Sequence, residues 1–280
     1  MMYSVVDIAG TNAMLRQILS NAAAAMVGMA SAYEEFSRNE KQLASRATSK
    51  PKIRVGITMF GVTTPCVDKI RAHLEEKYPV EVYVFHATGH GGKAMERLVE
   101  EGRLDAILDI TTTEICDHLM GGNMSAGSAR LEAALKAGIP NVISFGATDM
   151  VNFGPRATVP ERYTDRKLFE HNPSVTLMRT TEEECRRIGN FIVEKVRNFA
   201  KDPNMVEIII PKGGVSMIAV PRGAFADESA DKALMVSVKE GLRNSGVRIV
   251  EDDRDINDPG FAVDAAEALM RLAERRGKGV

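Results

Sequence analysis

The chain has 280 residues, 44% of them hydrophobic and 26% charged, with 36 Lys and Arg against 38 Asp and Glu. This length allows one large or two small domains with a sizeable buried core. The formal net charge of −2 argues against a general nucleic-acid-binding protein, because such proteins usually carry a basic surplus.

Cysteine usage and hydropathy restrict the class of protein further. Cys66, Cys116 and Cys185 stand far apart and form no CxxC pair, which argues against a zinc finger or a disulfide scaffold. No apolar run approaches the ~20 residues of a membrane-spanning helix, and the N-terminus lacks the basic region of a signal peptide. We therefore expect a soluble cytoplasmic protein that binds neither nucleic acid nor a membrane.

Residues 1–52 are predicted to form an N-terminal helical arm and linker. Asn12 offers a helix start, and apolar residues follow at helical spacing: Met14, Ile18, Ala22 and Met29. Residues 34–52 are polar and mixed in charge, which is typical of a linker or a solvated helix end. Because the apolar face of the arm needs a surface to pack against, we expect a homodimer.

Residues 53–280 alternate between strand and helix patterns. The expected strands cover residues 53–59, 80–85, 104–110, 142–145, 206–210 and 247–250. Helical patterns lie between them, whereas residues 147–179, which contain Pro155, Pro160 and Pro173, are predicted to be a long irregular stretch. The alternation predicts an α/β fold with a doubly wound, mostly parallel, Rossmann-like sheet and helices on both faces.

Ligands of an open parallel sheet bind beyond the carboxyl ends of its strands, and five loops at that edge are rich in Gly, Thr and Ser. Glycine permits close backbone approach, and free N–H groups at helix N-termini bind anions. Each loop alone is more typical of simple turns and caps, but together they predict a cleft for a small molecule bearing phosphate or carboxylate. The candidate binding residues are Gly61, Thr63, Thr64, Thr88, Gly89, Gly91, Gly92, Lys93, Thr111, Thr112, Thr113, Gly146, Asp149, Gly213, Gly214 and Ser216.

Two alternatives use the ionisable residues of the same loops. A small-metabolite enzyme of lyase, hydrolase or isomerase type would use His86 or His90 for acid–base chemistry, assisted by Asp109 or Glu114. The same histidines with Asp109, Glu114 or Asp117 are a weaker metal hypothesis, and we assign no metal site. A third interpretation is a homodimeric interaction module.

Several longer motifs resemble a known family. They are Met2 to Gly10, Gly121-Gly122-Asn123 to Gly127, Gly146-Ala147 with Asp149 to Gly154, Val159 to Arg162, His171-Asn172-Pro173 through Thr181, and Gly213-Gly214-Val215-Ser216. On these motifs the chain is similar, over nearly its whole length, to the Tm-one-like ATP-binding domain family. This family comprises bacterial and plant proteins related to the tomato mosaic virus resistance inhibitor.

The resemblance implies ATP or a related nucleotide as ligand and an additional N-terminal domain of similar size as partner. It places residues 1–33 in the linking segment and the first helix of the second domain, so part of a nucleotide site could lie in the N-terminal domain. The chain departs from the family pattern after Ser216, where relatives have an acidic residue and Ile218-Ala219-Val220 is apolar. The inhibition of a virus is a plant specialisation and is not carried over.

Overall fold

A computed structural model describes residues 2–46 and 52–278, and the chain divides into two compact units, residues 1–51 and 52–280. In the first unit, helix α1 (Ala13–Arg46) begins where the side chain of Asn12 accepts a hydrogen bond from the Leu15 amide at 2.9 Å. The helix continues through residues 34–46, which agrees with the predicted alternative of a solvated helix end and not with a linker there, and residues 47–51 lie outside the described part. Within the described ranges, no helix has the length and apolar character that a membrane span requires.

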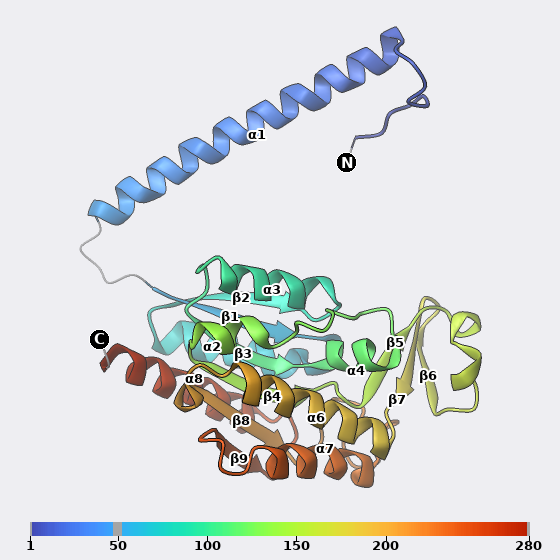
Figure 1. Ribbon diagram of the computed structural model, residues 1–280, viewed down its shortest axis with the longest axis vertical. Coiled ribbons are helices and arrows are strands. Elements are labelled where there is room, and N and C mark those ends of the chain that lie inside the picture. Colours follow the sequence, from blue (N-terminus) through green and yellow to red (C-terminus); the bar gives the residue numbers. More distant parts are fainter. Residues whose placement is uncertain (1, 47–51, 279–280) are drawn as a thin grey trace. The chain divides into compact units, whose positions relative to one another are not determined.

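The second unit is built on a six-stranded parallel sheet with the order β2-β1-β3-β4-β8-β9 (Figure 1). The strands are β1 (Ile53–Met59), β2 (Val80–His86), β3 (Ala106–Thr111), β4 (Asn141–Gly146), β8 (Val206–Pro211) and β9 (Arg248–Asp252). Every residue of β3, β4 and β8 is buried. These strands are covered on both faces, which explains their nearly continuous apolar sequences.

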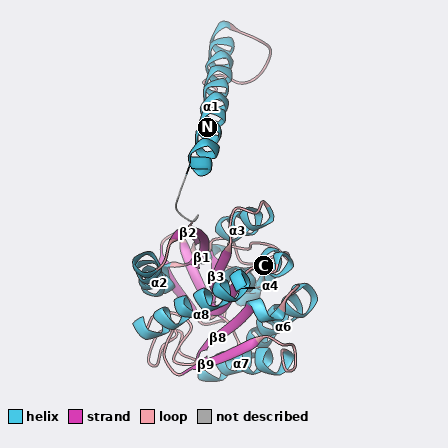
Figure 2. Ribbon diagram, turned by 90° about the vertical axis from the view of Figure 1, so that its left-hand side faces the viewer, coloured by secondary structure: helices cyan, strands magenta, loops and turns pink. Residues whose placement is uncertain are grey.

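Helices cover both faces of this sheet (Figure 2), which confirms the predicted doubly wound α/β fold. One face is covered by α2 (Thr64–Lys77) and α8 (Pro259–Lys278), which pack on β1, β3 and β4. The other face is covered by α3 (His90–Glu100), α4 (Thr113–Met120), α5 (Glu132–Ala137), α6 (Glu182–Phe199) and α7 (Glu228–Gly241). The strand order reverses between β1 and β3, so the topological switch point lies there.

Residues 147–179 are not an irregular stretch, and that prediction is wrong. They form a second, antiparallel sheet with the order β5-β7-β6, made of β5 (Met150–Phe153), β6 (Leu168–Asn172) and β7 (Val175–Arg179). Figure 1 shows this small sheet beyond the carboxyl ends of the parallel strands. Its strands have only four or five residues, and β6 is mostly exposed, so no long apolar run marks them in the sequence.

Candidate functional site

The five predicted loops cover residues 60–64, 86–93, 109–114, 146–149 and 211–216. They follow β1, β2, β3, β4 and β8 and meet at the carboxyl edge of the parallel sheet. The hydroxyls of Thr63 and Thr111 are 2.8 Å apart and join the loops after β1 and β3. The Thr112 amide donates to the Gly146 carbonyl at 3.0 Å, which joins the loops after β3 and β4. The Ala147 amide donates to the Val215 carbonyl at 2.8 Å and so connects the loop after β8.

The candidate residues divide by exposure. Exposed to solvent are Gly61, His86, His90 and Lys93. Partly exposed are Thr64, Thr88, Gly91 and Gly213. Buried are Thr63, Gly89, Gly92, Asp109, Thr111, Thr112, Thr113, Gly146, Asp149, Gly214 and Ser216. A ligand that does not rearrange the loops can therefore make extensive contact only with the first two groups.

The glycine-rich start of α3 already holds an anion of the protein itself. One carboxylate oxygen of Glu114 accepts hydrogen bonds from the amides of Gly89 at 2.6 Å and Gly92 at 3.0 Å. A β-carbon at Gly92 would lie 2.0 Å from the other oxygen of Glu114, and one at Gly91 would lie 2.0 Å from the His86 carbonyl oxygen. Glycine is needed here for approach to an internal carboxylate, and these two amides are not free for a phosphate.

A buried arginine organises the same region. The side chain of Arg130 is fully buried and contacts Asp109 through two hydrogen bonds, of 2.5 and 2.6 Å. It also donates to Glu114 at 2.8 Å and to Glu96 at 3.3 Å. Burial alone would lower the pKa of Arg130, but the attraction of Asp109, Glu114 and Glu96 outweighs it and raises that pKa. We call Arg130 and its three carboxylates the Arg130 network.

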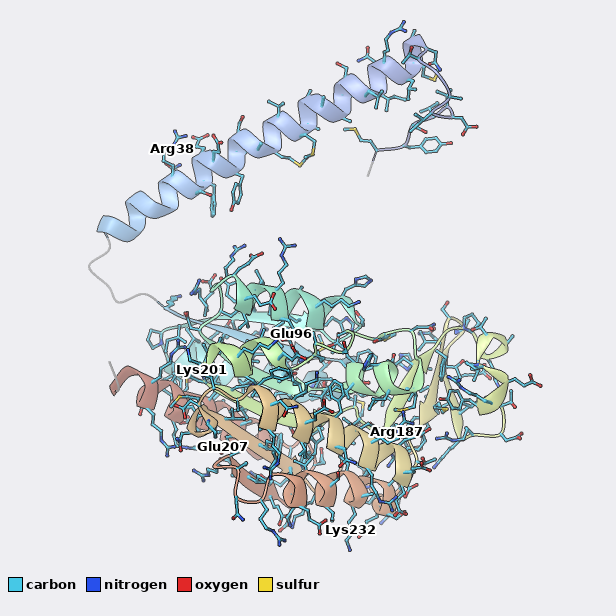
Figure 3. The ribbon with its side chains drawn as sticks, in the orientation of Figure 1. Arg38, Glu96, Arg187, Lys201, Glu207 and Lys232 are labelled. Carbon is cyan, nitrogen blue, oxygen red and sulfur yellow. The ribbon has the colours of Figure 1, made fainter. Side chains whose placement is uncertain are left out.

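The Arg130 network links three elements to the turn ahead of α5, in which Arg130 lies. Asp109 comes from β3 and Glu114 from α4, whereas Glu96 projects from α3 and accepts the amides of Leu131 at 2.5 Å and Ala133 at 2.7 Å (Figure 3). Burial is the main reason that the pKa of Glu96 is raised. The sequence did not predict Arg130, because its partners lie 16, 21 and 34 residues away and no local motif connects them.

These contacts bear on the acid–base and metal hypotheses. Asp109 is buried and already bound by Arg130 and by the Thr58 hydroxyl at 2.8 Å. The imidazole of His86 is exposed and lies 5.6 Å from the ring of Phe60, measured between centroids. Among residues 2–46 and 52–278, no three His, Cys, Asp or Glu side chains gather in a way that could hold a metal ion. Catalysis by His86 and His90 stays a prediction.

Asp149 is a second buried carboxylate at this edge. Its side chain is 0% exposed, one oxygen accepts the Ser216 hydroxyl at 2.9 Å, and the other has no hydrogen-bond partner. Burial raises the pKa of Asp149 to about 7, against the lowering influence of Arg179 and of the bond from Ser216. Ser216 in turn accepts the amides of Ile218 and Ala219, so its hydroxyl closes a turn beside Asp149.

Arg179 and Asp231 form an ion pair between β7 and α7. A guanidinium nitrogen of Arg179 lies 2.5 Å from a carboxylate oxygen of Asp231, and the two side chains are 4% and 12% exposed. Burial raises the pKa of Asp231 to about 6, and Arg179 opposes that rise. A buried acid with a raised pKa beside a charged partner is typical of functional sites. Purely structural ion pairs perturb pKa values in the same way.

Asp231 also lines a pocket of about 570 Å³ at the carboxyl end of β8. Its walls are the Gly213–Gly214 turn, the start and middle of α7, and Glu251 of β9. Three lysines surround it: Lys212, Lys232 and Lys239. Its apolar wall consists of Ala219, Pro221, Ala226, Met235 and Val236. The volume is in the range of small-molecule sites, and the pocket contains the predicted residues Gly213 and Gly214.

The lysines of the pocket differ in their partners. Lys212 lies 2.6 Å from Asp253 and Lys239 pairs with Glu251, all of them at exposed or partly exposed positions. Lys232 is exposed on α7 (Figure 3), and no ion pair of the described residues involves it. Exposed ion pairs contribute little free energy, so an anionic ligand can compete for these ammonium groups at small cost.

Comparisons with known proteins agree with the motifs. Residues 52–273 match the C-terminal domain of the uncharacterised protein family UPF0261, and residues 1–35 match its N-terminal domain. The second match corrects the expectation that residues 1–33 are a linking segment and the first helix of the second domain. The main body, from residue 52, carries the C-terminal domain.

Individual relatives give the same result. The chain is 46% identical over 275 residues to a UPF0261 protein of Clostridium tetani, covering 98% of this chain and 64% of the relative. It is 41% identical over 276 residues to the ToMV resistance protein Tm-1(GCR237) of Solanum lycopersicum, covering 97% and 35%. The chain thus spans less than two thirds of these relatives. Among solved structures, a LacI regulator from Lactobacillus casei with bound Tris matches 82% of this chain and 94% of its own. The sequence identity is 10% and the TM-score is 0.31. This similarity is too slight to support any inference.

Proposed function

We propose that this chain, which belongs to the uncharacterised protein family UPF0261, binds a small molecule bearing phosphate or carboxylate groups, with ATP as the first candidate. The proposed site is the pocket beside the Gly213–Gly214 turn. The observation that carries the proposal is the position of three lysines around a pocket of about 570 Å³ at the carboxyl end of β8. The carboxyl side of a parallel sheet is where ligands bind, and this pocket lies on that side next to β8 and β9, away from the switch point between β1 and β3.

The charges of the pocket support an anionic ligand with further polar groups. The ammonium groups of Lys212, Lys232 and Lys239 are suited to phosphate or carboxylate oxygens, because opposite charges attract most strongly where water is partly excluded. Three of the four acidic residues are engaged by the protein: Asp231 pairs with Arg179, Glu251 pairs with Lys239, and Asp227 accepts the Ala230 amide at the start of α7. Glu228 remains at the wall, where its carboxylate suits a ligand hydroxyl group.

The apolar wall supports a ligand that also has a hydrophobic part. Met235 and Val236 of α7 face the pocket together with Ala219 and Pro221. Ligand pockets usually combine such apolar walls with a few polar groups that fix the orientation of the ligand. A nucleotide has both parts, since its base is flat and weakly polar and its phosphates are charged.

Calorimetric titration with ATP, ADP, inorganic phosphate and dicarboxylates tests the proposal. The Lys232→Glu variant should weaken binding at least tenfold, because it replaces an attractive charge by a repulsive one. The matched control is Lys69→Glu, which makes the same change at an exposed position of α2, on the opposite face of the sheet. If no anion binds, or if both variants weaken binding equally, the proposed site is wrong.

A further inference from the structure

Helix α1 carries an apolar seam along most of its length. Its members follow one another at alternating spacings of four and three residues: Leu15, Leu19, Ala22, Met26, Met29, Tyr33 and Phe36. This spacing places them in one continuous stripe. Five of them are 51% to 69% exposed, namely Leu19, Met26, Met29, Tyr33 and Phe36. We call this stripe the α1 seam.

The positions beside the α1 seam show which kind of surface would cover it. Between residues 18 and 32 they are Ile18, Ala23, Ala25, Ala30 and Ala32. Two-stranded coiled coils usually carry charged residues at these positions. A helix packed inside a globular domain instead has a broader apolar face. The α1 seam therefore suits burial in a domain better than pairing with a second copy of the same helix.

The family boundaries point to the same domain. Residues 1–35, which include the α1 seam up to Tyr33, match the N-terminal domain of the family. Residues 52–273 match the C-terminal domain, and the chain divides into two compact units at the same place. The apolar segment ahead of α1 is exposed as well, with Tyr3 at 82% and Ile8 at 77%.

We propose that the α1 seam is the docking surface for the remainder of the family's N-terminal domain. The partner is a complementary apolar surface of that domain, and the flanking alanines allow its backbone to approach α1 closely. The homodimer expected from the sequence would use the same face of α1. A second copy of the chain and the N-terminal domain therefore cannot occupy the α1 seam at the same time. This inference does not depend on the proposed ligand pocket.

Co-expression tests this docking. Tagged chain is produced together with the part of the N-terminal domain of the Clostridium tetani relative that this chain does not match. The two should copurify in equal amounts and give the mass of a 1:1 complex by light scattering. Met26→Glu should reduce the retained partner at least tenfold, because it places a charge in the buried interface. Ser31→Glu, on the opposite side of α1, should leave it unchanged.

Three outcomes would overturn the proposal. In the first, the wild-type chain does not retain the partner. In the second, the Met26→Glu and Ser31→Glu variants retain the partner equally. In the third, the chain alone is a dimer that the Met26→Glu substitution dissociates but addition of the partner does not. The last outcome would assign the α1 seam to a second copy. The control for folding is the thermal unfolding of the second unit, residues 52–278, measured in the whole wild-type chain and in both variants. Both substitutions lie outside that unit, so its unfolding temperature should be unchanged.

Discussion

Replacement of Arg130 by methionine should destabilise residues 52–278 strongly. Arg130→Met keeps much of the side-chain volume but leaves Asp109, Glu114 and Glu96 at positions that are 2%, 0% and 14% exposed, without their cation. Removing one partner of a buried ion pair costs about 3–5 kcal/mol. For a domain of this size, that loss corresponds to a fall in melting temperature of roughly 6–20 °C.

The pH dependence gives the prediction a sign. Without Arg130, the buried carboxylates favour their neutral form in the folded state, so their pKa values rise above those of the unfolded chain. The folded variant then binds more protons than the unfolded one, and its stability falls as the pH rises. The difference between wild type and Arg130→Met should therefore be larger at pH 8 than at pH 5.

Urea unfolding followed by circular dichroism measures both effects. The matched control is Arg54→Met, because Arg54 also binds an aspartate, Asp105, at 2.8 Å, but the two side chains are 36% and 40% exposed. That change should cost only about 0–1 kcal/mol. If Arg130→Met does not fold, Arg130→Lys, which keeps the charge and loses the planar fork, takes its place. Equal losses for the Arg130 and Arg54 variants, without pH dependence, would refute the reasoning.

Two further predictions concern the carboxyl edge of the sheet. Gly92→Ala should lower the urea midpoint, because the new β-carbon would lie 2.0 Å from Glu114, whereas Gly277→Ala on α8 meets nothing within 4 Å and should not. For Asp149, whose pKa is raised from 3.8 to about 7, wild-type stability falls as the pH rises through that interval. The Asp149→Asn variant lacks this titrating carboxyl group. The free energy of unfolding of the variant, relative to wild type, should therefore rise between pH 4 and pH 8 by at most about 4 kcal/mol. A difference that does not change with pH would contradict the raised pKa of Asp149.

The parallel sheet was predictable from the sequence because its signals are local. Strand β1 appears as an alternation of apolar residues with arginine, glycine and threonine, and β8 appears as a short apolar run. Glycine or threonine marks the turns that follow them. The start of α6 was predictable in the same way, because Thr181 and Glu184 have capping-box spacing, and their side chains do bond reciprocally. The resemblance to a family added the expectation of a second domain, which the family boundaries support.

The elements that were missed depend on contacts distant in sequence. Strand β6 is mostly exposed and is ordered by pairing with β7, for example Phe169 opposite Leu177. Helix α4 has only eight residues and begins directly after β3, in a run of threonines that favours strands. The five loops were correctly expected to share one edge of the sheet. No local sequence signal marks the hydrogen bonds from the Gly89 and Gly92 amides to Glu114. The pairing of Asp109 with Arg130 has no local signal either.

The Arg130 network also constrains how such a sequence can drift. Loss of Arg130 leaves three buried carboxylates without a cation, and loss of Asp109 or Glu114 leaves buried guanidinium donors without an acceptor. Each of these single substitutions therefore produces an unstable protein. An apolar core of the same shape would be acceptable, but only after several changes made together. Descendants of a common ancestor should therefore keep these four residues as a block or lose them as a block, and intermediate combinations should be rare.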